Sequence, residues 1–534
     1  MAAAVDHPAM SVGQRYVYHT YQGLAALFAE PHGAEGEPDE PLRFKLYRDA
    51  PYYPLSQTLP LKLGDARWSF PSYRTDTSDA PQATLTLETI SQLLYYSYGF
   101  SRQDLGAQVA WPFHRLTPSA RCFFPTELYA WLPSVGPLPA GIYHYDPAHH
   151  RLALLRPGDY RALLGALLAA DLRDCGPILL TTSLFWKTAF RYRNFAYRLC
   201  TQEAGLVAGN ALLVGAALGW HGHVHYQFLD QPLNHLLGCE TDEESTLAVL
   251  PFYAAPRLLL RSHPDTDEAA RAELPALRLH YLKRSSLDRA SCALLCEIDH
   301  ASQLRTTAAI RTLPPALRVC DAAVARAAPA PERAPVELAA ALHARSSGDV
   351  EFNPLATPLA YDQFWEIVRN ALAPYTSDLS ASSAAPRLEC YLVINHVIGI
   401  APGVYRLCGS CDALHQVALG SSMAQLHAIQ PGMNCSGASV VCYLVSRSGG
   451  VDPALGARSY RVLHFESGIV AQRLAVLGAA YGLVARCSDS FNVEHCCALL
   501  QLGATEALPL LQIALGYERP GSGAGLRYRF AIRF

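Results

Sequence analysis

The pattern of apolar positions along the chain predicts strands and helices in two stretches of the same order. Residues 206–220 form the most apolar helical segment, which is rich in Gly and Ala. This segment has about fifteen residues where roughly twenty are needed to cross a bilayer, so we expect a buried helix. Two other stretches, which begin at Glu127 and Glu389, each predict a strand, a Gly turn, a second strand and then a helix. Each half of the chain is therefore expected to contain one α/β unit.

The two stretches are copies of one another. Residues 197–237 align with residues 460–500 at a constant offset of 263 without a gap, and 13 of the 41 pairs are identical. Chance would give roughly three identities, so the duplication is real. A repeated unit of about 200 to 250 residues predicts an intramolecular version of a homodimer, in which two domains face each other about a pseudo-twofold axis. Any site at that interface would combine residues of both copies.

The repeat divides the chain into three parts. We expect a first domain over residues 1–255 and a second, more diverged domain over residues 337–534. Between them, residues 256–336 match neither copy, and they end in an Ala-rich and Pro-rich stretch, residues 322–335, with the composition of a linker. The sequence therefore predicts two tandem domains and leaves the middle segment unplaced.

Composition and charge narrow the class of protein. Half of the residues are apolar, which excludes intrinsic disorder for the bulk of the chain. The 43 Lys and Arg residues against 46 Asp and Glu residues leave a net charge of −3, so no overall field favours nucleic acid or an anionic membrane. Residues 1–10 lack the basic and apolar regions of a secretory signal, so we expect a cytoplasmic protein whose 15 Cys are reduced thiols.

A set of short motifs follows one order along the first copy. No single motif is decisive, because strings as short as Pro-Ser-Ala occur by chance, but order and spacing together are specific. The motifs are the FKLY of residues 44–47, Pro118-Ser119-Ala120, Glu127-Leu128-Tyr129, the GIYHYD of residues 141–146, Arg191-Tyr192, Tyr197-Arg198 and Glu203-Ala204-Gly205. This order resembles the SagB-type dehydrogenases of the nitroreductase-like flavoprotein superfamily, which work beside cyclodehydratases in azole-containing peptide biosynthesis. The resemblance covers nearly all of residues 15–255 and, more weakly, residues 337–534.

The resemblance implies an FMN-dependent α+β fold. It consists of two tandem nitroreductase-like domains, each a central antiparallel sheet flanked by helices, paired as an intramolecular pseudo-dimer. In this superfamily FMN sits at the dimer interface, where one subunit binds its phosphate and the other supplies a Pro-Ser loop. The family's phosphate signature, Arg-Arg-Ser-x-Arg before a helix, is partly retained as Arg345, Ser346 and Ser347 in the second copy, and as Ser72 and Arg74 in the first. Arginine and a helix N-terminus both suit phosphate oxygens.

The Pro-Ser loop is retained in the first copy and lost in the second, the reverse of the phosphate signature. It is recognisable as Pro118, Ser119 and Ala120 in the first copy, whereas the shortened loop of residues 373–386 in the second copy has no counterpart. One composite site is therefore expected to remain intact, with the FMN phosphate held by the second copy and the ring flanked by the first. The other pairing is expected to be impaired. An ordinary helix cap and an ordinary turn remain open alternatives for these two motifs.

The predicted core helix of the first copy carries Glu203 and Gly205, which recur as Glu466 and Gly468. The resemblance places Glu203 and Gly205 beside the cofactor. We favour an architectural role for both, in which the Gly allows close helix packing under the cofactor.

Two departures from the family bear on catalysis. Azoline oxidation removes a proton from carbon and passes a hydride to the flavin, so it needs a base, and the family's Lys-Tyr pair is thought to assist. This chain has Arg191 and Tyr192 there. The pKa of an Arg stays above about 12, so Arg191 is a fixed cation, and Tyr192 is either the catalytic residue carried over or a packed aromatic. Arg121, where a small Gly is usual after Pro-Ser-Ala, would either narrow the substrate space or bind an anionic group.

We therefore expect an FMN-dependent oxidoreductase that dehydrogenates a peptide-bound or carrier-bound substrate. Azoline-to-azole oxidation in natural-product biosynthesis is the leading reaction, with a cyclodehydratase as a partner. Two alternatives stay open: a degenerate flavoprotein-fold scaffold that recruits a modifying enzyme or a leader peptide, and an NAD(P)H-dependent nitro or quinone reductase. The alternating His of residues 221–225 would suit zinc or copper, but the aligned residues 484–488 contain no His, so we expect no metal site.

Overall fold

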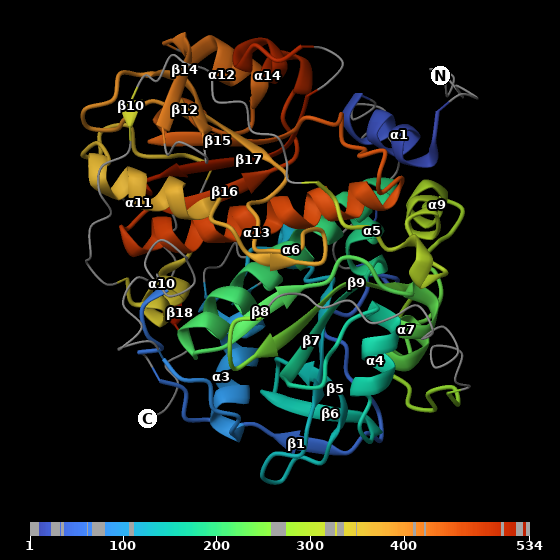
Figure 1. Ribbon diagram of the computed structural model, residues 1–534. Helices are drawn as coiled ribbons and strands as arrows, with labels where there is room; N and C mark the ends of the chain where they lie inside the picture. The colour runs from blue at the N-terminus through green and yellow to red at the C-terminus, as the bar shows by residue number, and fades with distance from the viewer. Residues whose placement is uncertain are drawn as a thin grey trace.

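Each half of the chain forms an α+β domain around an antiparallel sheet with helices on its faces, as the computed structural model shows (Figure 1). The domains meet along two long helices that lie side by side, α6 (Ala196–Ala217) and α13 (Arg458–Ala480). The structure describes residues 10–22, 33, 37–60, 62–66, 81–105, 112–257, 274–314, 326–327, 336–348, 350–408, 413–420, 423–503, 507–519 and 527–529. The expected α+β architecture of two domains is confirmed.

The sheet of the first domain has eight strands. In spatial order they are β1 (Tyr52–Pro54), β6 (Arg151–Pro157), β5 (Gly141–Asp146), β4 (Thr126–Leu132), β7 (Cys175–Leu184), β9 (Glu244–Tyr253), β8 (His221–Val224) and β11 (Thr376–Ser377). The first seven pair antiparallel, and β4, β5 and β6 are neighbours both in the chain and in the sheet. The eighth strand, β11, comes from the second half of the chain and pairs parallel with β8.

The sheet of the second domain repeats this arrangement with seven strands. In spatial order they are β10 (Arg326–Ala327), β14 (Ala413–Leu419), β13 (Gly403–Cys408), β12 (Glu389–Ile394), β15 (Val440–Ser446), β17 (Leu508–Gly516) and β16 (Val484–Ser488). Even a register shift recurs: it falls between Ile142 and Tyr143 in β5 and between Val404 and Tyr405 in β13, which are aligned positions. The sequence repeat is therefore a repeat of strand order and local geometry.

Shorter helices cover the sheets and the domain junction (Figure 1). They are α1 (Val12–Val17), α3 (Leu87–Tyr98), α4 (Arg161–Leu168), α5 (Trp186–Tyr192), α7 (Asp230–Leu237), α9 (Ala293–Ala301), α10 (Leu338–Ala344), α11 (Tyr361–Ala371), α12 (Met423–Ile429) and α14 (Val493–Leu500). Within the described ranges no helix combines the length and hydropathy that a membrane span requires.

The repeated glycines lie where α6 and α13 cross. A Cβ on Gly205 would stand 2.0 Å from the carbonyl oxygen of Phe465, and a Cβ on Gly468 would stand 2.1 Å from that of Gln202. Both distances are far inside van der Waals contact, so only Gly permits this approach. The architectural role expected for these positions is thus visible as a backbone-to-backbone contact between the domains.

The second half also adds short strands to sheets of the first half. Besides β11 on β8, strand β18 (Arg527–Arg529), close to the C-terminal end of the chain, pairs antiparallel with β2 (Phe100–Asp104) of the first half, and β2 in turn pairs with β3 (Phe113–Arg115). Each of these two strands adds backbone hydrogen bonds across the junction. The domains are therefore interlocked as well as packed.

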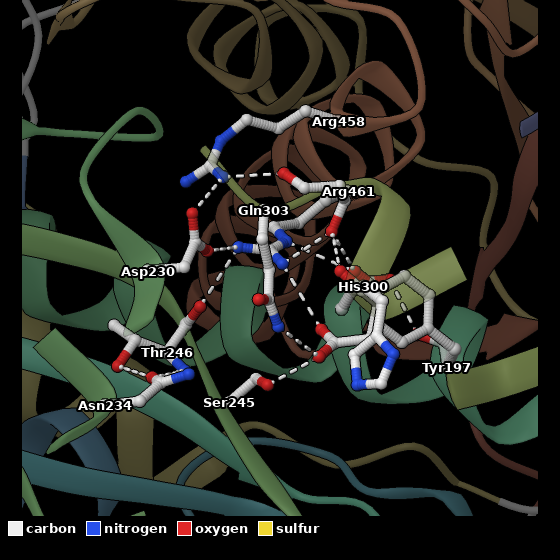
Figure 2. Close-up of polar contacts among 12 residues, drawn as sticks. Tyr197, Asp230, Asn234, Ser245, Thr246, His300, Gln303, Arg458 and Arg461 are labelled. Carbon is white, nitrogen blue, oxygen red and sulfur yellow. Dashed lines mark hydrogen bonds and ion pairs between the residues drawn. The ribbon is translucent and has the colours of Figure 1, made fainter. Parts of the chain in front are cut away.

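A buried ionic network ties the middle segment to both domains. Figure 2 shows Arg458 and Arg461 reaching from α13 to Asp230 at the start of α7, with N···O distances of 2.7 Å each. Arg461 also pairs at 3.2 Å with Asp299, whose carboxyl lies on α9 in the segment that the sequence left unplaced. All four groups are almost fully buried, so each depends on the others for charge compensation. Part of residues 256–336 is thereby a structural bridge.

Candidate functional site

A cavity of about 680 Å³ lies at the junction of the two domains. Its walls combine residues of the first domain, from β3, the loop that follows it, and α6, with residues of the second domain that follow α10 and belong to β16. Both groups of residues that the sequence assigned to one composite site, the phosphate signature of the second copy and the Pro-Ser loop of the first, contribute to this lining. The structure thus brings the two halves of the expected site around one space.

Arg345 is a buried cation of this lining with one donor left over. It is 3% exposed, and its Nε and Nη2 donate to the carbonyls of Leu116 and Arg115 of the other domain at 2.9 and 3.0 Å. Its Nη1 is buried without a hydrogen-bond partner among the described residues. Burial and the neighbouring Arg102 lower the pKa of Arg345 to about 10, so it is still a cation at neutral pH. An unsatisfied buried guanidinium is suited to a phosphate oxygen.

The neighbours of Arg345 support an anion site, but the helix N-terminus expected beside it is not there. Ser347 and Gly348 line the cavity, and Ser346 lies behind them, where its Oγ accepts bonds from Gly348 N–H at 3.1 Å and Arg102 Nη1 at 3.3 Å. No helix N-terminus stands here: Arg345 follows the C-terminal end of α10, and the next described helix, α11, begins at Tyr361. Any phosphate at this place would therefore rely on side chains and loop amides.

The loop with Pro118, Ser119 and Ala120 forms the opposite wall. Immediately after it, Arg121, Cys122 and Phe124 adopt left-handed backbone conformations with φ of 47°, 54° and 49°. Each such non-Gly residue costs about 1–2 kcal/mol, and strain of this kind persists only where its surroundings enforce it.

Two polar side chains hold the strained loop in place. Arg43 Nη1 donates to the carbonyls of Arg121 and Cys122, at 2.9 Å each, and its guanidinium stacks 4.4 Å from the ring centre of Phe123. Ser119 Oγ accepts the backbone N–H of Phe124 at 2.9 Å. Ser119 therefore shapes the loop, and what the loop presents to the cavity includes the exposed side chain of Arg121.

Glu203 supplies a buried carboxyl group to the cavity wall. It is 3% exposed and accepts a hydrogen bond from the hydroxyl of Tyr98 at 3.1 Å. Burial raises its pKa to about 7, against the opposing effects of bonds from Ser119 and Tyr98. A carboxyl with this pKa exists in both protonation states near neutral pH, which is what proton transfer requires. Gly205, two residues further along α6, serves the helix crossing and is not part of the lining.

The predicted catalytic pair separates in the structure. Tyr192 lines the cavity, where its hydroxyl interacts with Arg121 and burial raises its pKa, so the phenol stays protonated at neutral pH. Arg191 instead donates from Nη1 to the carbonyl of Gly33 at 2.8 Å and is not among the lining residues. The structure therefore lends no support to a catalytic role for Arg191, and that role stays a prediction. Ser72 and Arg74 lie outside the described residues.

At the other pairing of the copies, the described residues place protein groups around the equivalent carboxyl. Glu466, the repeat partner of Glu203, is buried and accepts bonds from the Tyr375 hydroxyl at 2.7 Å and the Arg387 N–H at 2.8 Å. Asp378, which follows β11, accepts the N–H groups of Tyr226 and Gln227 at 3.0 and 2.8 Å. The loop that the sequence found shortened thus packs against the end of β8 and leaves Glu466 surrounded by protein groups.

The His residues of β8 lie on the strand that pairs with β11, near Asp378 and Tyr226. His223 is 2% exposed, its ring lies 4.7 Å from that of Tyr253, and burial lowers its pKa to about 4. Over the ranges that the structure describes, no cluster of three or more potential metal ligands occurs. The imidazole of His223 is therefore accounted for by packing, and none of the three His residues of 221–225 is among those that line the cavity.

The sequence missed several cations of the site. Arg102 on β2, Arg115 on β3 and Arg486 on β16 all line the cavity, and Arg115 is buried with Nε and Nη1 unbonded to any described residue. Each is a single Arg in a short strand, with no spacing signal that would connect it to the others.

Comparisons with known proteins agree on the fold. No family model matches the chain. The "Putative nitroreductase MJ1384" of Methanocaldococcus jannaschii is 26% identical over 137 residues, which span 25% of this chain and 65% of that protein. A crystal structure of a "putative nitroreductase" from Anabaena variabilis superposes with a TM-score of 0.69 at 21% identity, over 96% of this chain and 100% of that chain. The chain has a nitroreductase-like fold.

The near-complete coverage means that the nitroreductase-like likeness extends over both halves of the chain rather than over one domain. At this identity it establishes fold and not chemistry. A chain of the E. coli microcin synthetase McbBCD complex with truncated pro-MccB17 bound matches at 23% identity over 35% of this chain and 73% of that chain. Its TM-score of 0.29 is too low to establish a shared fold. The chemistry of this nitroreductase-like fold therefore depends on the residues that line the cavity.

Proposed function

We propose that this protein is an FMN-dependent oxidoreductase whose cavity at the domain junction binds one FMN. It dehydrogenates a peptide-bound or carrier-bound substrate, and azoline-to-azole oxidation beside a cyclodehydratase is the reaction we assign. The observation that carries the proposal is the convergence of Arg345 and Ser347 from one domain with residues 118–120 from the other around a single space. Arg345 brings to that space a buried Nη1 that no described residue satisfies.

The lining residues fit the two ends of FMN. Arg345, Ser347 and Gly348 would hold the phosphate, because a buried cation and loop amides favour a dianion over water. Residues 118–120 and the face of α6 near Glu203 would flank the ring, and Tyr192 lines the same space. FMN supplies the acceptor for the two electrons that leave with the substrate hydride.

The residues of the chain handle the proton. Oxidation of an azoline also releases a proton from carbon, and the carboxylate form of Glu203 can accept it, because the pKa of Glu203 lies at about 7. The raised pKa of Tyr192 keeps its hydroxyl protonated, so Tyr192 donates a hydrogen bond to the substrate rather than acting as a base.

Flavin retention tests the proposal most directly. The purified protein is expected to hold one FMN per chain, measured by its absorbance after release. Arg345→Ala is expected to weaken FMN binding by a few kcal/mol at most, about ten- to hundredfold in Kd, because it removes one charge-assisted contact. Arg173→Gln is the matched control, since Arg173 is exposed and pairs with Asp171 far from the lining residues.

Three results would contradict or redirect the proposal. A colourless protein that shows no flavin absorbance after FMN is added would end it. Equal FMN affinity in Arg345→Ala and the wild type would remove Arg345 from the site. Rapid oxidation of NADH or NADPH with a quinone, without dehydrogenation of an azoline peptide, would assign the protein to the reductase alternative.

A further inference from the structure

A second hollow, of about 620 Å³, lies beside the junction cavity in the second domain. Its walls are α12, the loop that follows this helix, and residues 350–351, and we call it the α12 groove. Val350, Gly432 and Met433 line both the α12 groove and the junction cavity. The two spaces therefore meet along the loop that follows α12.

Gly432 forms an open rim between the two spaces. It is exposed, and a Cβ built on it would meet no described atom within 4 Å. Its backbone is also outside the left-handed region, so neither packing nor conformation requires Gly at this position. The next residue, Met433, is by contrast 5% exposed and packs in the core of the second domain. The absence of a side chain at Gly432 therefore leaves room for an extended chain to pass from the cavity to the groove.

The lining of the α12 groove is apolar and adaptable. The chain has four Met residues, and two of them, Met423 and Met433, belong to this lining. Met423 is 73% exposed, and exposed Met side chains are typical of surfaces that bind varied apolar partners. No Lys or Arg is among the described residues that line the groove, and its carboxylate, Glu351, is paired with Arg519. The groove therefore favours a neutral, apolar occupant.

We propose that the α12 groove binds the peptide chain of the substrate, while the reacting ring crosses the rim at Gly432 into the junction cavity. This inference rests on the proposed function, because it assigns a place to the part of the substrate that does not react. A space of about 680 Å³ is typical of a site for one cofactor-sized ligand. FMN and the reacting ring therefore leave no room in the cavity for several further residues.

The lining of the groove also distinguishes a peptide from a carrier. A carrier presents its substrate on an arm that ends in a phosphodiester, and a phosphodiester bound in the groove would need a cation. The described residues that line the groove supply none. A peptide with apolar side chains next to the azoline needs only the apolar contact that Met423 and Met433 offer. We therefore assign the groove to a peptide chain.

Compounds that carry the finished thiazole ring test the proposal, because they bind without turnover. The protein, with its FMN content measured, is titrated by calorimetry with a blocked single-ring thiazole, a hexapeptide in which Leu residues flank the ring, the same hexapeptide with Ser in place of Leu, and the ring on a phosphopantetheine arm. The Leu peptide is expected to bind about tenfold or more tightly than the ring alone, because burial of one Leu side chain is enough for that difference. The Ser peptide and the arm-linked ring are expected to bind at most a few-fold more tightly than the ring alone.

Two variants test whether the peptide lies in the α12 groove. Gly432→Trp fills the open rim, and Met423→Glu puts a charge into the apolar wall. Each is expected to reduce the preference for the Leu peptide over the ring alone to about twofold or less, whereas Met423→Leu should keep it.

Gly503→Trp and Leu355→Glu are the matched controls. A Cβ on Gly503 also meets no described atom within 4 Å, and Leu355 is 92% exposed. Neither residue lines the groove or the cavity. Both controls are expected to keep the full preference for the Leu peptide.

Three outcomes would overturn the proposal. They are equal affinity for the Leu peptide and the ring alone, a preference that survives in Met423→Glu, and tighter binding of the arm-linked ring than of the Leu peptide, which would assign the groove to a carrier. Met423 is not among the residues that line the junction cavity, so its variant reports on the groove even if Gly432→Trp fails to fold. A protein that holds no FMN would refute the proposed function, while the preference for the Leu peptide and its loss in Met423→Glu would still decide the occupant of the groove.

Discussion

The crossing of α6 and α13 allows one quantitative prediction, for Gly205→Ala. The added Cβ would stand 2.0 Å from the carbonyl oxygen of Phe465. A carbon and an oxygen need roughly 3.4 Å, so the helices must separate by more than about 1 Å, or the backbone must shift as far. Overpacking of this kind costs about 1–3 kcal/mol or more, whereas Ala gains about 1 kcal/mol of helix propensity over Gly. We therefore expect a net loss of about 1–2 kcal/mol.

A second glycine on the partner helix provides the control. A Cβ on Gly478 of α13 would meet only the end of a side chain, Leu515 Cδ2 at 3.0 Å, so Gly478→Ala is expected to be neutral or slightly stabilising. Thermal unfolding followed by circular dichroism should place Gly205→Ala a few degrees below both the wild type and Gly478→Ala. The double variant Gly205→Ala with Gly468→Ala should lose less than the sum of the single losses, because both methyl groups push the same helices apart.

Equal stability of Gly205→Ala and Gly478→Ala would refute the role assigned to the helix crossing. That result would mean that the helices can separate without cost, and that the repeated glycines are not required by the crossing. FMN retention adds a second measure, because the cavity lies between the same two domains. A stable Gly205→Ala variant that binds FMN normally would therefore contradict the assigned role of the crossing on both counts.

Two further predictions follow from buried charges. Burial raises the pKa of Glu203 from 4.5 to about 7, so the stability that the protonated carboxyl contributes is fully present below pH 4.5 and is lost as the pH rises through 7. This contribution is on the order of 3 kcal/mol, and Glu203→Gln should remove it from the pH dependence of the unfolding free energy. An identical pH profile in Glu203→Gln and the wild type would refute the prediction. Asp230→Asn should destabilise the protein by about 3–5 kcal/mol, because Arg458 and Arg461 lose their shared carboxylate. Urea unfolding would compare it with Asp159→Asn, which removes an exposed ion pair with Arg161. Equal midpoints for the two variants would show that the network in Figure 2 is dispensable.

Much of the fold could be predicted from the repeat. The alignment of the copies predicted two α/β units of one strand order. The identity of Gly205 and Gly468 predicted close helix packing, but not that these two helices cross each other. The middle segment could not be placed, because the contact of Asp299 with Arg461 joins positions 162 residues apart and has no local signal. Strands β11 and β18, which the second half adds to the first, could not be predicted either, because strands of two or three residues show no periodicity.

The candidate site was predictable only where a motif survived. The complementary losses pointed to Arg345 in one copy and Pro118 in the other, and both line the cavity. The expected helix N-terminus beside Arg345 was wrong, because the short helix α10 ends there. Arg102 and Arg115 carried no signal, since a single Arg in a strand is ordinary until its neighbours are known.

The sequence by itself determined the duplication, the order of elements in each copy and the residue types that must be small or charged at aligned positions, because these follow from local pattern and from comparison of the chain with itself. Only the tertiary structure decided which groups share one space. The cavity walls come from β-strands and loops hundreds of residues apart, and whether a cation such as Arg345 is paired or left with an open donor depends on carbonyls of the opposite domain. Burial then sets the pKa of Glu203, and burial is a property of the packed molecule rather than of any stretch of chain.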